Sequence, residues 1–130
     1  MLTEVFATKK LKYLFFIFLI LASAPSVSAQ SATVKTFYRN LCSGKINAAK
    51  KQLSSTVKLH DSVIKMTFEG RYQFCVNSGG LKGFQIKNTN VGRKIAGVIG
   101  DVLFKDGSKE SIRMKLYKEK GLWKIAWEIK

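Results

Sequence analysis

The chain has 130 residues, and its 23 Lys and Arg against eight Asp and Glu give a formal net charge of +15. This length accommodates one small domain with a modest core and excludes a multidomain assembly. The charge favours anionic surroundings such as lipid headgroups, envelope polymers or an acidic protein; a merely solvated surface is the alternative. Two cysteines and the single His60 are too few for a tetrahedral metal site, so we expect no metal and no cofactor.

The N-terminal segment has the three parts of a secretory signal peptide. Lys9, Lys10 and Lys12 precede an apolar run over residues 14–24, and Val27-Ser28-Ala29 supplies small residues at the cleavage positions. The apolar run is about half the roughly 20 residues that span a bilayer. Cleavage is therefore the prediction, and a retained membrane anchor is the alternative.

We predict a signal peptide over residues 1–29 and a single mature domain over residues 30–130. Cleavage after Ala29 removes three basic residues and one acidic residue, which leaves a net charge of +13. The mature domain would be periplasmic or secreted. No nucleic acid partner is expected after export.

Three stretches of the mature chain have helical periodicity. Residues 31–42 and 46–53 each place apolar side chains three and four positions apart, and Ser43-Gly44 separates them. Residues 59–76 keep the same spacing, although their β-branched and aromatic content leaves a strand open. The apolar positions are Val34, Phe37, Tyr38, Leu41 and Cys42 in the first helix, Ile46, Ala49 and Leu53 in the second, and Val63, Met66, Thr67, Gly70 and Phe74 in the third.

The two cysteines of the mature chain, Cys42 and Cys75, fall within the first and third of these helices. An even pair of cysteines in an exported protein typically forms a disulfide. We therefore predict a Cys42–Cys75 bridge, with two buried free thiols as the alternative.

Beyond the Asn77-Ser78-Gly79-Gly80 loop the apolar pattern changes to a period of two. Strands are expected over residues 81–88 and 93–105. Two more follow in the terminal meander, which carries the turn signals Asp106-Gly107 and Lys120-Gly121. The predicted fold class is α+β, with N-terminal helices packed on a curved antiparallel four-stranded sheet.

Alternation along these strands separates a core face from an outer face. The core face carries Ala96, Val98, Val102, Phe104, Ile112, Met114, Leu116, Trp123, Ile125, Trp127 and Ile129. Cross-strand partners must share a face, which allows Leu116 to pair with Trp123, Met114 with Ile125, and Val102 with Ile112 through a three-residue loop over 106–108. The outer face then pairs Lys115 with Lys124, Asp101 with Arg113, and Tyr117 with Leu122.

Arg113, Lys115 and Lys124 form a candidate basic surface on this outer face. It could dock an acidic protein, an anionic envelope polymer or a lipid surface, or support a homodimer. Alternatively, these long side chains simply extend into water.

Two motifs carry a resemblance to a known superfamily. The opening VKTFYRNLCSGKINAAKKQLS and the ending LFKDGSKESIRMKLYKEKGLWKIAWEI resemble small secreted bacterial domains of the nuclear transport factor 2-like (cystatin-like fold) superfamily, in a branch of unknown function. The resemblance implies a cone-shaped α+β fold with a cavity between helices and sheet. Relatives include isomerases, dehydratases, transport factors and exported domains without assigned activity.

Enzymes of that superfamily use carboxylates or an Asp–His pair inside the cone, and the pattern here predicts none. Asp106, Glu110 and Glu119 are expected at turns, and Asp101 and Glu128 on the outer face. His60-Asp61 could act in acid–base chemistry, but Asp61 is better explained as a helix N-cap. No catalytic residue is therefore predicted.

Tyr38, Phe74, Trp123 and Trp127 are the candidate cavity lining, with core packing as the alternative for the two tryptophans. The expected function is an exported, non-enzymatic binding module that uses the cone or the basic outer face. One alternative is a small-molecule pocket protein or weak enzyme of the isomerase–dehydratase type. Another is a cationic factor that associates with the envelope or neutralises a protein.

Overall fold

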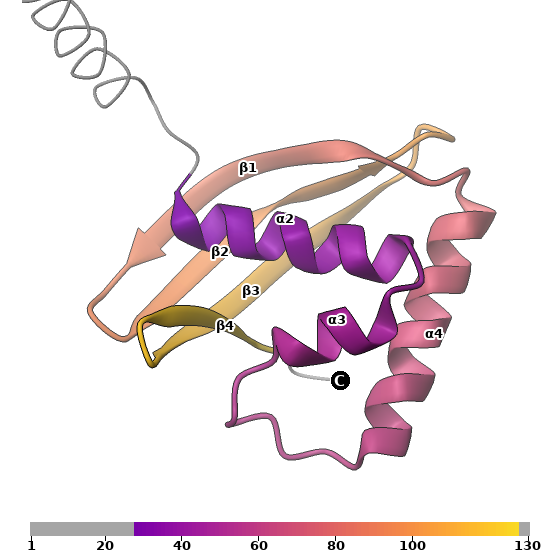
Figure 1. Ribbon diagram of the computed structural model, residues 1–130. Coiled ribbons are helices and arrows are strands. Elements are labelled where there is room, and N and C mark those ends of the chain that lie inside the picture. Colours follow the sequence, from indigo (N-terminus) through magenta and orange to yellow (C-terminus); the bar gives the residue numbers. More distant parts are fainter. Residues whose placement is uncertain (1–27, 128–130) are drawn as a thin grey trace, which may run out of the picture.

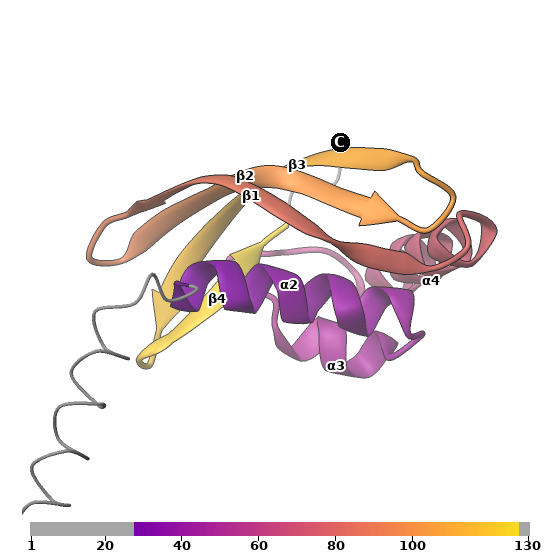
Figure 2. The ribbon, with the colours of Figure 1, turned by 90° about the horizontal axis from the view of Figure 1, so that it is seen from above.

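The structure, a computed structural model, describes residues 28–127. Three helices, α2 (Ala29–Cys42), α3 (Ile46–Lys51) and α4 (Asp61–Asn77), precede four strands. The strands β1 (Leu81–Val91), β2 (Ile95–Phe104), β3 (Lys109–Glu119) and β4 (Leu122–Ala126) form one antiparallel sheet in the order β1-β2-β3-β4. The helices lie on one side of this curved sheet, with α4 across one end of the layer (Figures 1 and 2). The predicted α+β architecture is confirmed.

The core lies between α2 and the concave face of the sheet. Val34, Phe37 and Leu41 of α2 are fully buried, because they repeat at helical spacing on the side that faces the strands. The predicted core face of the sheet is buried from Ala96 to Ile125. Trp123 and Trp127 are partly buried against the core.

The third helix forms as predicted, but its buried face is different. Met66 is 67% exposed and Phe74 is 43% exposed, so these two predicted positions do not face the core, whereas Val63 and Thr67 are partly buried. Ile64, Phe68 and Cys75 are buried instead. The physical reason is the Cys42–Cys75 disulfide, as predicted, which ties this side of α4 to the end of α2.

The terminal hairpin keeps its predicted faces but not its predicted register. Leu116 pairs with Ile125, and Lys118 with Trp123, a shift of two residues that preserves which side chains share a face. The turn explains the shift: Lys120 and Gly121 both have positive φ values, of 50° and 78°, the conformation of a two-residue type I′ turn.

The hairpin between β2 and β3 is shifted in the same way. The amide of Phe104 donates to the carbonyl of Ser108 at 2.9 Å, so the loop is residues 105–107. Gly107 takes the positive φ, of 89°, that ends such a three-residue loop. The predicted cross-strand pairs are therefore wrong. In the structure Gly100 pairs with Ile112, Asp101 with Ser111, Arg113 with Ile99, Lys115 with Gly97 and Ala126, Lys124 with Tyr117, and Leu122 with Glu119.

No helix within residues 28–127 is both long enough and apolar enough to cross a membrane. The predicted basic and apolar parts of the signal peptide lie outside the described residues, as do Glu128 and Ile129.

Candidate ligand pocket

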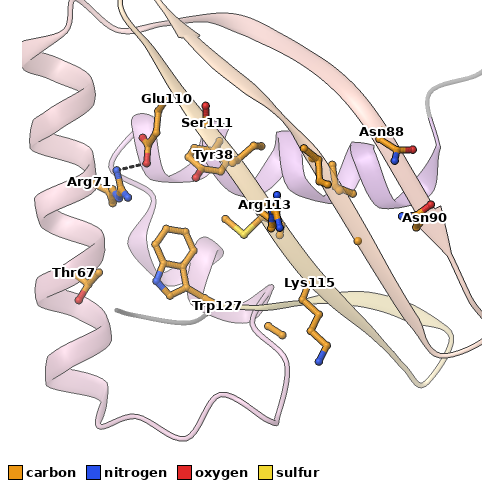
Figure 3. Close-up of a pocket in the computed structure, with 16 residues that line it drawn as sticks. Tyr38, Thr67, Arg71, Asn88, Asn90, Glu110, Ser111, Arg113, Lys115 and Trp127 are labelled. Carbon is orange, nitrogen blue, oxygen red and sulfur yellow. Dashed lines mark ion pairs between the residues drawn. The ribbon is translucent and has the colours of Figure 1, made fainter.

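An open pocket of about 640 Å³ follows β3 between α4 and the end of β4 (Figure 3). Its size falls within the range of about 300–1,000 Å³ that is typical of small-molecule sites. Side chains from both faces of β3 line the pocket, which therefore lies at an edge of this strand. The lining residues of β3, 110–115, come almost entirely before the part of the strand that pairs with β4, residues 115–119. The inner lining includes Tyr38, Thr67, Arg71, Glu110, Ile112, Met114 and Trp127; the outer lining includes Asn88, Asn90, Ile99, Ser111, Arg113 and Lys115.

An ion pair lies at the inner side of the pocket. The Nη1 atom of Arg71 approaches Oε1 of Glu110 to 2.6 Å, and the two side chains are 35% and 23% exposed. Arg71 follows Phe68 by three positions and precedes Cys75 by four, so it lies on the buried stripe of α4. Glu110 shares the inner face of β3 with Ile112. The pair therefore joins the helix to the sheet beside the pocket.

Tyr38 contributes a hydroxyl group to the same side. Its side chain is 3% exposed and lines the pocket near Arg71 and Glu110 (Figure 3). No hydrogen bond joins the Tyr38 hydroxyl to any residue between 28 and 127. Burial raises the pKa of Tyr38 well above its usual range, the charge of Glu110 raises it further, and Arg71 lowers it. Tyr38 is therefore a neutral phenol whose O–H can donate to a ligand.

Trp127 provides an aromatic surface opposite these polar groups. Its ring packs edge-on against Phe37 and Phe68, with centroid distances of 5.3 and 6.0 Å. The guanidinium of Arg71 lies 5.7 Å from the Trp127 ring centroid, a cation–π contact. These contacts hold the indole ring in place beside the ion pair.

The outer side of the pocket is more polar. Asn88 and Arg113 both lie beside Ile99, on the two neighbouring strands, so their side chains share the outer face. Lys115 lies farther along β3, where its Nζ atom is 5.1 Å from the Tyr117 ring centroid. Amide and cationic groups thus continue the lining beyond the apolar inner side.

The predicted site residues divide between the pocket and other places. Tyr38 and Trp127 line it, whereas Phe74 packs edge-on against Phe104. Trp123 lies under the Lys118 ammonium, outside the lining.

The predicted basic surface is also divided. Arg113 and Lys115 share the pocket wall, but the Nζ atom of Lys124 donates to the carbonyl of Lys51 at 2.9 Å. Lys124 therefore points toward α3 rather than joining the other two.

The acidic residues require two corrections. Glu110 was expected at a turn, yet it lies within β3 and faces the pocket, because the loop ends at residue 107. Asp61 is not an N-cap: His60 occupies that position without a side-chain hydrogen bond, and Asp61 pairs with Lys50 at 3.3 Å. Glu119, at the end of β3, accepts hydrogen bonds from Ser54 and Ser55, of which the Ser54 bond lowers its pKa most.

Asp101 lies on the outer face, as expected, but it is buried there. Its carboxylate pairs with Lys87 at 3.1 Å and accepts a hydrogen bond from Ser111. Among residues 28–127 no cluster of three His, Cys, Asp or Glu could hold a metal ion.

Arg71 is not among the residues predicted from the sequence, and Glu110 is predicted at a turn instead of in the pocket. Arg71 lies on the same face of α4 as the buried residues Ile64, Phe68 and Cys75. Because a charged residue is rarely buried unless it is paired, an arginine on this face indicates an acidic partner within the domain. Glu110 lies two and four residues before Ile112 and Met114, so the alternation of β3 would place it on the inner face. The prediction assigned Glu110 to the turn and therefore did not use this pattern.

No protein-family model and no curated protein matches the chain. Solved structures do match. The crystal structure of a provisionally assigned NTF2-like transpeptidase from Campylobacter jejuni aligns with a TM-score of 0.65 and 20% sequence identity. The alignment covers 73% of this chain and 94% of that one. This similarity shows that the fold is nuclear transport factor 2-like.

Proposed function

We propose that the protein is an exported binding module whose pocket takes a small ligand with a planar apolar body and a neutral carbonyl group. The observation that carries this proposal is the Tyr38 hydroxyl, which lines the open pocket and has no hydrogen-bond partner among residues 28–127. A ligand whose oxygen accepts this hydrogen bond gains a directional contact, worth about 0.5–1.5 kcal/mol net for a typical hydrogen bond.

The neighbouring groups define the class of ligand. Trp127 offers an aromatic face to a planar body. The charges of Arg71 and Glu110 compensate each other at 2.6 Å, so this side of the pocket has no net charge to attract an ion. A carbonyl oxygen can accept from the Tyr38 hydroxyl and from the remaining N–H groups of Arg71.

The Arg71–Glu110 pair also favours binding over catalysis. Among the residues that line the pocket, Glu110 is the single acid, and its carboxylate is already paired with Arg71. Both cysteines in residues 28–127 are in the disulfide, so neither offers a thiol nucleophile. The isomerase–dehydratase alternative nevertheless gains an acid inside the cone beside Tyr38. This alternative predicts that the protein catalyses exchange with solvent of a ligand proton on the carbon next to a carbonyl group, and that Glu110→Gln abolishes this exchange.

Export rests on two observations. The N-terminal sequence has the pattern of a signal peptide, and the Cys42–Cys75 disulfide is typical of oxidising compartments. Intact-mass measurement of the protein recovered from the periplasm or the medium should give a chain that begins at Gln30.

Ligand-observed NMR with benzamide tests the binding proposal. Benzamide should receive saturation from the wild-type protein, because the Tyr38 hydroxyl can donate to its carbonyl oxygen beside the Trp127 ring. Tyr38→Phe should weaken the benzamide signal several-fold, while Phe74→Leu, a change in an aromatic residue outside the pocket, should leave it unchanged. Equal signals from all three proteins would contradict the proposal.

A further inference from the structure

The tips of the β1–β2 and β3–β4 hairpins form a surface separate from the pocket that Tyr38 and Trp127 line. The carbonyl of Lys94, between β1 and β2, accepts a hydrogen bond from the amide of Lys118 at 2.8 Å, so the tip of one hairpin lies beside the end of β3. Both tips project at the same end of the molecule (Figures 1 and 2). We refer to residues 91–95 and 118–122 as the hairpin-tip surface.

This surface combines exposed aliphatic side chains with cations. Val91, Ile95 and Leu122 are 57%, 50% and 61% exposed, among the most exposed large apolar residues of the described chain. The basic residues of the same two segments, Arg93, Lys94, Lys118 and Lys120, are all exposed.

The one acid of the hairpin-tip surface does not offset these cations at the tip. The Glu119 carboxylate accepts hydrogen bonds from Ser54 and from the amide of Ser55, so it points back toward the loop after α3. Within residues 28–127 the cations of the hairpin-tip surface thus form no ion pair, and they lie next to apolar groups. Such a combination fits an interface in which anionic headgroups lie above an apolar layer.

The start of α2 lies at the same end of the molecule as the hairpin-tip surface. The Ser31 hydroxyl lies 3.2 Å from that of Thr89, which joins the start of α2 to the end of β1, two residues before Val91.

We infer that the hairpin-tip surface docks on an anionic lipid bilayer, with Lys and Arg at the headgroups and Val91, Ile95 and Leu122 at the interface. The inference is independent of the pocket: it requires no ligand, and loss of pocket binding would not affect it. Juxtamembrane cations each favour an anionic surface, so reversing several of them changes the affinity steeply.

Vesicle flotation of the protein as cells export it tests the inference. The wild type should float with vesicles of equal parts phosphatidylglycerol and phosphatidylcholine, and far less with phosphatidylcholine alone. The triple change Lys94→Glu, Lys118→Glu and Lys120→Glu should weaken binding to the anionic vesicles by at least about tenfold. Because the N-terminus is the same in every variant, any contribution from it cancels.

A matched control reverses three exposed lysines elsewhere, Lys58, Lys65 and Lys82, and so has the same net charge as the tip variant. It should keep most of the wild-type binding, and Leu122→Ser should weaken binding without altering the charge. Equal losses in the two triple variants would show a general charge effect and overturn the inference. Absence of a preference for anionic vesicles, or a tip-dependent dimer or acidic-protein complex in its place, would also overturn it.

Discussion

The guanidinium of Arg71 and the carboxylate of Glu110 meet at 2.6 Å and connect α4 to β3 beside the pocket. Because both groups are partly buried, removal of one leaves the other without its partner in a partly desolvated site. Glu110→Gln should therefore lower the free energy of unfolding by about 1–2 kcal/mol. The pair of Lys50 with Asp61, whose side chain is 86% exposed, is the control, and Asp61→Asn should change stability by less than about 0.5 kcal/mol in the same urea titration. Equal effects would indicate that the inner pair has no structural role.

Tyr38→Phe should separate stability from binding. Since the Tyr38 hydroxyl has no protein partner in residues 28–127, its removal should leave the free energy of unfolding unchanged or raise it by up to about 1 kcal/mol. Benzamide binding should fall in the same variant. Tyr72→Phe, at an exposed position on α4, should alter neither quantity. A large loss of stability in Tyr38→Phe would mean that the hydroxyl group is bound within the protein.

The disulfide should contribute substantially to stability. It closes a segment with a sequence separation of 33, for which loop-entropy arguments give about 3–4 kcal/mol. Replacing Cys42 and Cys75 together by Ala should lower the free energy of unfolding by about that amount. Alkylation before and after reduction checks the bridge itself: free thiols in the native exported protein would contradict it.

Asp101 predicts a dependence of stability on acid pH. A hydrogen bond from Lys87 lowers the pKa of this buried carboxyl most, with the Lys87 charge and the Ser111 hydroxyl in support. Because the folded-state pKa lies below the unfolded value of about 4, the carboxylate contributes stability above that pH. This contribution is lost as pH falls through the folded-state pKa.

Unfolding measured from pH 7 to pH 2 tests this assignment. Asp101→Asn should be less stable than the wild type at pH 7, and the difference should shrink at low pH. Glu69→Gln, at an exposed position, should show the same dependence of the unfolding free energy on pH as the wild type. A constant difference between Asp101→Asn and the wild type would exclude the titration of Asp101 as its cause.

Most of the fold could be predicted from the period of the apolar residues. The stripe of α2 and the alternation in β2 and β3 each have one face that must be buried, so the sequence pattern determines them. Register could not be predicted in this way, since a shift of two residues leaves every face unchanged. It depends on Lys120, a lysine with positive φ, a conformation that residue type does not indicate.

The pocket was only partly predictable for a related reason. Tyr38 and Trp127 follow apolar periodicity and were among the candidates. Arg71 and Glu110 are charged residues on inward-facing sides of α4 and β3, and a pattern of apolar residues does not include them. Their pairing depends on the packing of α4 against the sheet, which the Cys42–Cys75 bridge fixes.

The two tryptophans provide the most direct measurement of whether the pocket binds a ligand. Trp127 lines the pocket and Trp123 does not, so the indole N–H signals of one protein sample report both the site and its control. During a benzamide titration observed by ¹H–¹⁵N NMR, the account predicts a saturable shift of the Trp127 signal and little change at Trp123. It also predicts that Tyr38→Phe reduces the Trp127 shift. An unchanged Trp127 signal, or equal shifts at both tryptophans, would contradict it.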